Sequence, residues 1–222
     1  DLLWSDKRVD AWTRFQNKVW QAFRFLRMHV TEAPAPATPG PYDRWILARL
    51  GSTVSRTRQA IGTYRFNDVA TEIHAFAWYE LCDWYLELTK PALYGPDGPA
   101  KDAARHTLWT VFSALARLLH PCMPFLAEEL WRHLPGTTGS VIRAPFPIVE
   151  DFPPDAGSLA EVALLQEVIV TVRRIRAEKQ IAPKVALTAQ AGAALVAAMA
   201  PHVSALRDLA NVTLVEGGRV EG

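Results

Sequence analysis

The sequence is poor in cysteine, which excludes two classes of small protein. Only Cys82 and Cys122 occur among 222 residues, too few for a disulfide framework. Neither has a second cysteine or a histidine at the spacing of a zinc site, and the six histidines form no HxxxH pair. We therefore expect two reduced thiols and no metal site.

Long apolar runs are also missing. No run reaches the roughly 18 residues needed to cross a bilayer, and the start of the chain lacks a signal-peptide pattern. We expect a soluble, cytoplasmic protein with no membrane contact. The chain begins at Asp1 rather than at a methionine, from which we expect an excised piece of a longer protein.

Signatures of catalysis are absent from the sequence as well. The GPDG and GTTG segments have glycines typical of turns but lack the lysine and the strand-to-helix setting of a phosphate loop. Glu128 and Glu129 are adjacent, and adjacent residues of a helix point in different directions. The sequence therefore predicts no catalytic residue and favours a binding role.

The charge is nearly balanced overall but unevenly distributed. The formal net charge is +1. Lysine and arginine outnumber acids in residues 1–65, whereas acids outnumber them in residues 66–100. A basic face beside an acidic helix would suit a surface that contacts phosphates. The alternative is that two solvated helix faces merely differ in charge.

The longest periodic stretch runs from residue 65 to 92 and predicts one long helix of about 35–40 Å. Its apolar residues recur at steps of three and four, which lines one side of a helix: Phe66, Val69, Ala70, Ile73, Ala77, Leu81, Trp84 and Leu88. A second, mostly polar side carries Asp68, Glu72, Tyr79, Asp83, Glu87 and Lys90. Pro91 is expected to end the helix, because proline has no N–H to donate.

Four more helices are predicted around it, at residues 6–30, 41–62, 102–119 and 124–134. Ser5 or Asp6 can cap the first helix, with Val9, Trp12 and Val19 among its inward residues. The Pro- and Ala-rich segment 31–41 must be an exposed connector. We expect a core that contains Trp12, Phe23, Ile73, Trp84, Phe112 and Leu119.

These elements predict a mainly α fold: an antiparallel helical bundle followed by a small α/β appendage. We place the bundle at residues 1–140, an extended crossing segment at 141–158, and the appendage at 159–222. The appendage should contain a helix at 159–180, a strand at 184–190, a helix at 193–210 and a strand at 212–216. Arg173, Arg174, Arg176 and Lys179 lie at the end of its first helix, where cations suit the helix dipole.

Six stretches in order match a family. They are FQNKVWQAFRFLRM, DRWILARL, YRFNDVA, CDWYLELTKP, HPCMPFLAEELW and RRIRAEKQIAPK. Together they make the chain resemble the anticodon-binding domain of valyl-tRNA synthetases. Two of them, DRWILARL and HPCMPFLAEELW, are shared with related class I synthetases, including the isoleucyl enzymes. The last segment resembles the small domain that in this family leads into a C-terminal coiled coil, which is missing here.

The resemblance implies a parent enzyme that joins valine to its tRNA with ATP. HIGH-like and KMSKS-like signatures do not occur in these residues, so we expect no cofactor and no synthetic activity in this chain. Its implied partners are the valine tRNA and the catalytic domain of the same polypeptide, in a monomer.

The resemblance assigns the anticodon to Arg24, Trp45, Glu87 and Lys90, and sugar–phosphate contacts or support to Arg14, Asn17, Lys18 and Gln21. Loop bases are read by aromatic stacking and by hydrogen bonds to their edges, while Arg and Lys hold phosphates. The PAPATPGP connector departs from the family pattern, which leaves the spatial register of Arg24 and Trp45 open.

Three alternatives remain open. Glu87 and Lys90 could form a plain surface ion pair, and Trp45 could be a core residue. The domain could belong to an isoleucyl enzyme. The bundle could instead bind another protein and make no RNA contact.

Overall fold

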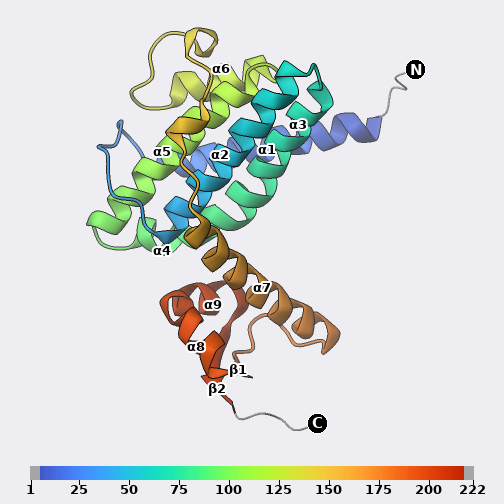
Figure 1. The fold of residues 1–222 in the computed structure, drawn as a ribbon, viewed down its shortest axis with the longest axis vertical. Helices are drawn as coiled ribbons and strands as arrows, with labels where there is room; N and C mark the ends of the chain where they lie inside the picture. Colours follow the sequence, from blue (N-terminus) through green and yellow to red (C-terminus); the bar gives the residue numbers. More distant parts are fainter. Residues whose placement is uncertain (1–5, 218–222) are drawn as a thin grey trace. The chain divides into compact units, whose positions relative to one another are not determined.

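A computed structural model describes residues 6–217, so Ser5, the alternative cap of the first helix, lies outside the described residues. The chain divides into two compact units, residues 1–155 and 156–222, which are described separately. The predicted mainly α fold is confirmed (Figure 1). The helices of unit 1 are α1 (Asp6–His29), α2 (Pro41–Gly62), α3 (Phe66–Ala75), η1 (Phe76–Tyr85), α4 (Leu86–Tyr94), α5 (Pro99–Leu119), α6 (Pro124–His133), η2 (Val141–Arg143) and η3 (Val149–Asp151).

The long helix of unit 1 is continuous but not uniform. It comprises α3, η1 and α4, residues 66–94, which we call the central helix. Its middle segment η1 is π-helical, a wider turn with i→i+5 bonds. The helix also passes through Pro91 to Tyr94, so the prediction that Pro91 ends it is wrong. Leu88 and Leu93 are buried on either side of Pro91, and their packing outweighs the lost backbone hydrogen bond.

The π-helical segment changes which aromatic side chain enters the core. Tyr85 is fully buried, whereas Trp84, expected inside, is partly exposed. Tyr85 donates its hydroxyl hydrogen to Asp43 Oδ1 of α2 at 2.6 Å. Trp12 is also exposed rather than buried, and Phe15 takes the inward position on α1. The other predicted core residues, Phe23, Ile73, Phe112 and Leu119, are confirmed.

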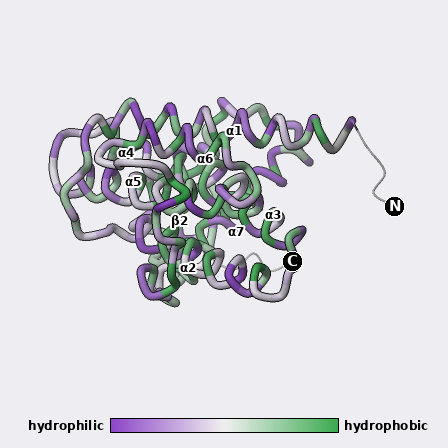
Figure 2. Tube along the Cα trace, turned by 90° about the horizontal axis from the view of Figure 1, so that it is seen from above, coloured by the Kyte–Doolittle hydropathy of each residue, from purple (hydrophilic) through white to green (hydrophobic). Residues whose placement is uncertain are grey.

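The helices pack in a bundle around α5. In Figure 2 hydrophobic and hydrophilic residues alternate along α1, which is expected of a helix with one buried side. Helix α2 runs antiparallel to the central helix, because Asp43, Arg49 and Arg56 meet Tyr85, Glu80 and Glu72 in reverse order. Most side chains of α5 from Ala103 to Leu119 are buried. The predicted antiparallel bundle with a buried fourth helix is therefore observed.

Unit 2 contains α7 (Ala156–Glu178), β1 (Leu187–Ala191), α8 (Ala193–Met199), η4 (Ala200–His202), α9 (Val203–Ala210) and β2 (Val212–Glu216). The two strands pair in parallel, with Leu187 opposite Val212. The helix expected at 193–210 is divided at Pro201, which starts a new turn because it cannot donate to the preceding one. The predicted α/β appendage is present.

Arg176 holds this unit together. Its guanidinium is buried and donates to the carbonyl oxygens of Ala182, Val185, Ala210 and Asn211 at 2.8–3.1 Å. Arg173 donates to the Leu209 carbonyl. The cation cluster of α7 was expected to serve the dipole of its own helix. Two of its members instead satisfy carbonyl groups at the end of α9 and in the loop before β1.

Candidate functional site

The predicted site residues other than Trp45 lie where α1 runs alongside the central helix in the same direction. Three contacts fix this register: the Trp12 and His74 rings at 5.7 Å between centroids, Lys18 Nζ and Asp83 Oδ1 at 2.6 Å, and the Phe25 and Tyr94 rings at 6.3 Å. Residue numbers rise together along both helices. Gln21 and Arg24 therefore lie in the same stretch of the bundle as Glu87 and Lys90.

We call this stretch the polar seam. It consists of Arg14, Asn17, Lys18, Gln21 and Arg24 of α1 and of Asp83, Glu87 and Lys90 of the central helix. The α1 side chains of the seam are exposed, apart from that of Lys18, which is partly buried. Arg24 Nη1 donates to Gln21 Oε1 at 3.2 Å, and Lys90 Nζ lies 2.6 Å from both carboxylate oxygens of Glu87. The seam offers hydrogen-bond donors and acceptors side by side at the surface.

Lys18 is the most constrained cation of the seam. Besides its ion pair with Asp83, its Nζ lies 3.9 Å from the centroid of the Trp78 ring, a cation–π geometry. A phosphate contact by Lys18 would have to replace the Asp83 carboxylate. Arg14 and Arg24 are more open to an incoming anion.

Trp45 does not belong to the seam. Its side chain on α2 is only 3 % exposed. A base can stack only on a ring face that solvent can reach, so the assignment of Trp45 to base stacking is corrected and we assign it to the core. The structure agrees with the alternative given above, that Trp45 is a core residue.

The sequence reasoning missed an aromatic cluster beside the seam. His74 stacks on Trp78, with ring centroids 5.5 Å apart and 12° between the planes, and Tyr79 meets His74 edge-on. Tyr79 is 55 % exposed, so it presents an aromatic ring to solvent. Burial, together with the charge of Lys18, lowers the pKa of His74. The only sequence signal was the place of Tyr79 on the polar side of the central helix.

Ion pairs neutralise the acidic residues that are concentrated in segment 66–100 of the sequence. Each acidic residue of the 66–100 segment has a cationic neighbour: Asp68 with Arg65, Glu72 with Arg56, Glu80 with Arg49, Asp83 with Lys18, Glu87 with Lys90, and Asp97 with Lys101. The acidic helix thus neutralises its basic neighbours. The expected broad basic face is reduced to exposed arginines such as Arg14 and Arg24.

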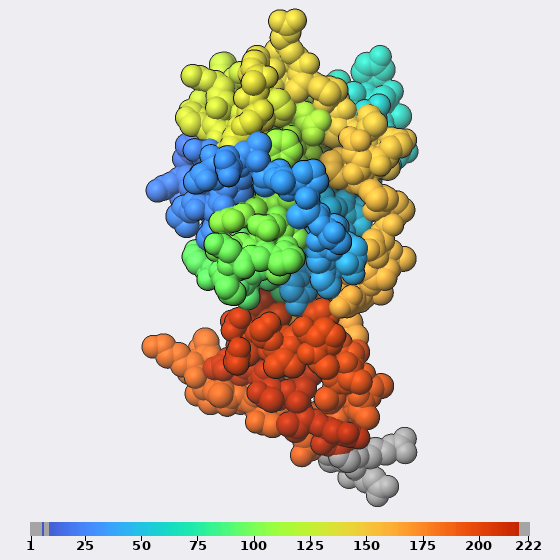
Figure 3. All heavy atoms as spheres, turned by 90° about the vertical axis from the view of Figure 1, so that its left-hand side faces the viewer, coloured from blue at the N-terminus to red at the C-terminus, as the bar shows by residue number. Residues whose placement is uncertain are grey.

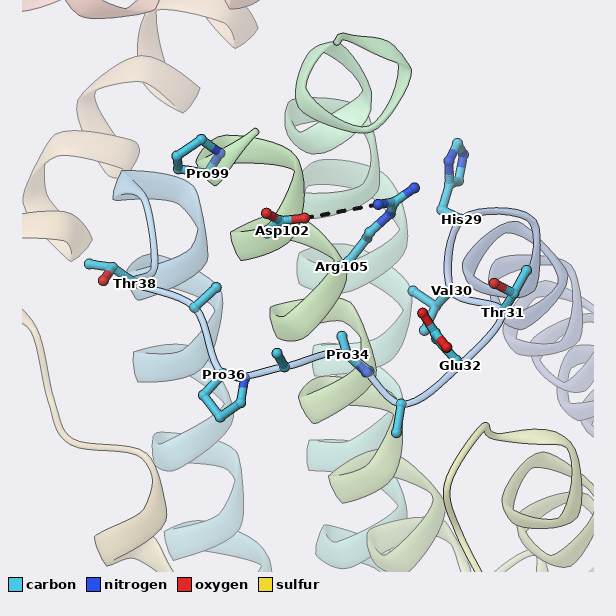
Figure 4. Close-up of a pocket in the computed structure, with 13 residues that line it drawn as sticks. His29, Val30, Thr31, Glu32, Pro34, Pro36, Thr38, Pro99, Asp102 and Arg105 are labelled. Atoms are coloured by element: carbon cyan, nitrogen blue, oxygen red, sulfur yellow. Dashed lines mark ion pairs between the residues drawn. The ribbon is translucent and has the colours of Figure 1, made fainter. Parts of the chain in front are cut away.

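One cavity of unit 1 is separate from the predicted site. It has a volume of about 660 Å³ and lies under the connector 31–38, where His29, Asp102 and Arg105 face it (Figure 4). Figure 3 shows the connector, in blue, against the beginning of α5, in green. None of the predicted site residues lines this cavity. Burial, with Arg105 and Lys101 nearby, lowers the pKa of His29.

The described residues form neither a metal site nor a membrane span. Within residues 6–217, no three His, Cys, Asp or Glu side chains gather as metal ligands. No helix in that range is long and apolar enough to cross a membrane. Both cysteines are free thiols, as predicted. Burial raises the pKa of Cys82 to about 12, which keeps its thiol protonated.

Comparison with known families decides what this bundle is. A family model described as "Anticodon-binding domain of tRNA ligase" matches residues 43–191, which is more than half of the chain. The chain belongs to this family. The match runs from the start of α2 through the central helix, α5, α6 and α7 to the end of β1. Helix α1, with most of the polar seam, lies before it.

Similar curated proteins carry a more specific name. The chain is 43 % identical over 194 residues to a valine–tRNA ligase of Geobacter sulfurreducens, an alignment that covers 82 % of this chain and 22 % of that protein. Over 202 residues it is 40 % identical to valine–tRNA ligases of two Stenotrophomonas maltophilia strains, K279a and R551-3, covering 86 % of the chain and 21 % of each protein. The chain thus spans about a fifth of the length of these relatives.

Proposed function

We propose that this anticodon-binding domain reads the anticodon of the valine tRNA, as part of a longer ligase that attaches valine to that tRNA with ATP. The domain itself contributes no ATP site in this proposal. The family match supports a tRNA ligase, and the shared name of the three relatives supports valine over isoleucine. The observation that carries the proposal is the polar seam, where two parallel helices offer base-reading and phosphate-binding groups side by side.

The roles within the seam follow from chemistry and exposure. Arg24, Glu87 and Lys90 supply donors and acceptors for base edges, and the exposed ring of Tyr79 supplies the stacking surface that Trp45 cannot. Arg14, Asn17, Lys18 and Gln21 contact the sugar–phosphate backbone or support those that do. Because most charges of the bundle are paired, few phosphates are neutralised, and we expect a shallow dependence of binding on salt.

The first prediction concerns discrimination between anticodons. In the full-length ligase, Glu87→Ala and Lys90→Ala should reduce the preference for the cognate tRNA over one with a mutated middle anticodon base, by about 1–3 kcal/mol if each group contacts a base edge. Arg14→Ala should weaken charging of both tRNAs by similar factors, because phosphates carry no sequence information. The measurement is kcat/KM for charging each tRNA, with valine-dependent pyrophosphate exchange as the control for an intact adenylate site.

Three outcomes would contradict the proposal. If Glu87→Ala and Lys90→Ala keep the wild-type ratio between the two tRNAs, the residues form only a surface ion pair. If an anticodon hairpin fails to bind the isolated 222-residue chain and the full-length variants charge normally, the bundle does not read RNA. An unchanged preference for valine tRNA over isoleucine tRNA in every variant would place discrimination elsewhere in the ligase.

A further inference from the structure

The cavity under the connector 31–38 is lined by charged groups of both signs. Arg105 and Asp102 come from α5, His29 ends α1, and Glu32 belongs to the connector (Figure 4). The volume of about 660 Å³ lies within the range of roughly 300–1,000 Å³ that is usual for ligand pockets. The cavity is therefore large enough for a small ligand and has polar groups that could orient it.

Two nitrogen atoms of residues that line this cavity lack a hydrogen-bond partner. They are Nε2 of His29 and Nε of Arg105, which are shielded from solvent and bond to none of the described residues. A buried polar atom without a partner is unfavourable, so structures usually supply one. The Nε–H of an arginine can only donate. A ligand oxygen is therefore the partner that fits this end of the cavity.

Positive charge acts on the same end of the cavity. Burial first, and then the charges of Arg105 and Lys101, lower the pKa of His29, because nearby cations oppose a further one. An anionic group of a ligand would be attracted to these cations. The two oxygens of a carboxylate also match the flat, forked guanidinium of Arg105. The ligand group that fits here is thus a carboxylate.

The two acids of the cavity argue against a ligand with negative charge alone. The carboxylates of Asp102 and Glu32 would repel a phosphate dianion. Arg105 Nη1 lies 3.9 Å from Asp102 Oδ1, whereas hydrogen-bonded pairs of this kind measure about 2.7–2.9 Å. Because their own contact is loose, Arg105 can still bind a carboxylate and Asp102 an ammonium group.

We propose that this cavity binds a free amino acid, with its carboxylate at Arg105 and His29 and its ammonium group at Asp102. A free amino acid carries both charges on one carbon atom, so it can bridge the two members of the loose pair. Val30 and Pro34 also line the cavity and offer apolar contacts to its side chain. The site is separate from the polar seam, whose residues do not line the cavity, and the inference does not rest on the proposed function.

The connector is fixed at its two ends. The Val30 N–H donates to the Leu26 carbonyl at 2.8 Å, and Arg44 Nη1 donates to the Pro39 carbonyl at 3.2 Å. Between these points, no backbone group of residues 31–38 hydrogen-bonds to the backbone of another described residue. An amino acid can therefore bind beneath the connector without breaking a backbone hydrogen bond.

An NMR titration of the 222-residue chain tests the binding. Each of the common amino acids is added in turn, and the resonances of the His29 ring and of the connector amides are followed. At least one amino acid should shift them with a Kd of about 1 mM or tighter. For that amino acid, the amine without the carboxylate and the acid without the amino group should each bind at least about tenfold more weakly, because each lacks a charge-assisted hydrogen bond.

Matched variants assign the two charges. Arg105→Gln and Asp102→Asn should each weaken binding at least about tenfold, since each removes one charged partner but keeps a polar side chain of similar size. Arg143→Gln, at an exposed arginine of η2 that does not line the cavity, should bind as the wild type does. The Asp102 side chain is 60 % exposed, so Asp102→Asn keeps the test valid if Arg105→Gln fails to fold. Wild-type affinity in folded Asp102→Asn would overturn the proposal.

Other occupants would give different results. If no amino acid shifts the His29 ring, the cavity holds only water and the proposal is wrong. If inorganic phosphate binds more tightly than every amino acid, the cavity is a plain anion site, which would also overturn it. If an anticodon hairpin shifts the His29 ring and no amino acid does, the cavity belongs to the RNA-binding surface, and the proposal is again wrong.

Discussion

Trp45 and Tyr79 illustrate how exposure decides the role of an aromatic residue. Both are large rings, but Trp45 on α2 is buried and Tyr79 on the central helix is more than half exposed. A ring inside the core contributes packing, and a ring at the surface can stack on a base. The two residues should therefore respond to truncation in opposite ways.

We predict that Trp45→Ala destabilises the domain by about 3–5 kcal/mol, the usual cost of removing a large core side chain. Tyr79→Ala should change stability by less than about 0.5 kcal/mol but weaken binding of an anticodon hairpin by about 1–3 kcal/mol through lost stacking. Urea unfolding measures the first effect and a hairpin titration the second. Tyr79→Phe, which keeps the ring, is the control and should bind normally. A stable Trp45→Ala variant that loses hairpin binding would restore the stacking role to Trp45.

At the scale of the element, the π-helical segment η1 gives the central helix its particular inward face. It brings Tyr85 into the core opposite Asp43, which also accepts the N–H of Gly40 at 2.9 Å before α2. Burial raises the pKa of Asp43 and of the Tyr85 hydroxyl. The hydrogen bond between Tyr85 and Asp43 therefore connects the beginning of α2 to the end of the π-helical segment.

Removing the Tyr85 hydroxyl should be costly for this connection. We predict that Tyr85→Phe lowers the free energy of unfolding by about 1.5–3 kcal/mol, because the buried Asp43 carboxylate loses a hydrogen bond. Adding Asp43→Asn should recover part of the loss, since a neutral amide is cheaper to bury. Urea unfolding of the two single variants and the double variant gives the coupling energy. Tyr94→Phe, at an exposed tyrosine, is the matched control, and an equal loss there would refute the interpretation.

At the scale of the whole molecule, two histidines of unit 1 couple its stability to pH. Burial is the first cause of the lowered pKa of both His29 and His74, with nearby cations adding to it. The unfolded chain therefore binds these protons more readily than the folded one, whose histidines stay neutral. As pH falls below the ordinary histidine pKa of about 6.5, protonation favours the unfolded state.

We predict that the free energy of unfolding falls as pH is lowered from about 7.5 to 5, and that His74→Gln makes this slope shallower. Urea titrations at a series of pH values measure it. The slope, rather than the stability at one pH, is the relevant quantity, because the substitution also removes ring packing. An unchanged slope in His74→Gln would remove this histidine from the coupling.

The periodicity of the sequence was sufficient for the outline of the fold. Helix α2 and strand β2 have their predicted bounds, and α5, α6 and α7 begin within three residues of the predicted positions. Apolar residues at steps of three and four need one buried side wherever they occur. The bounds and the buried side of each helix therefore follow from the local pattern, which a single sequence is enough to show.

The site could be predicted only in part, because its residues come from segments about 65 residues apart. The resemblance to the family assigned Arg24, Glu87 and Lys90 to one site. It could not predict that α1 runs parallel to the central helix or that Lys18 forms an ion pair with Asp83. It also left undecided whether Trp45 is a core residue or stacks on a base, since a tryptophan on an amphipathic helix can face the core or the solvent. Exposure depends on neighbours that the local sequence does not name.

The sequence by itself determined the helical class, the α/β appendage, the membership of the family and the absence of disulfide frameworks, because these follow from composition, local spacing and motifs. Only the tertiary structure decided that Tyr85 rather than Trp84 enters the core, that Pro91 stays within a helix, and that the acidic residues neutralise the basic ones. Each of these depends on packing or pairing between segments distant along the chain, whose free energy outweighs the preference of any single residue for its local conformation.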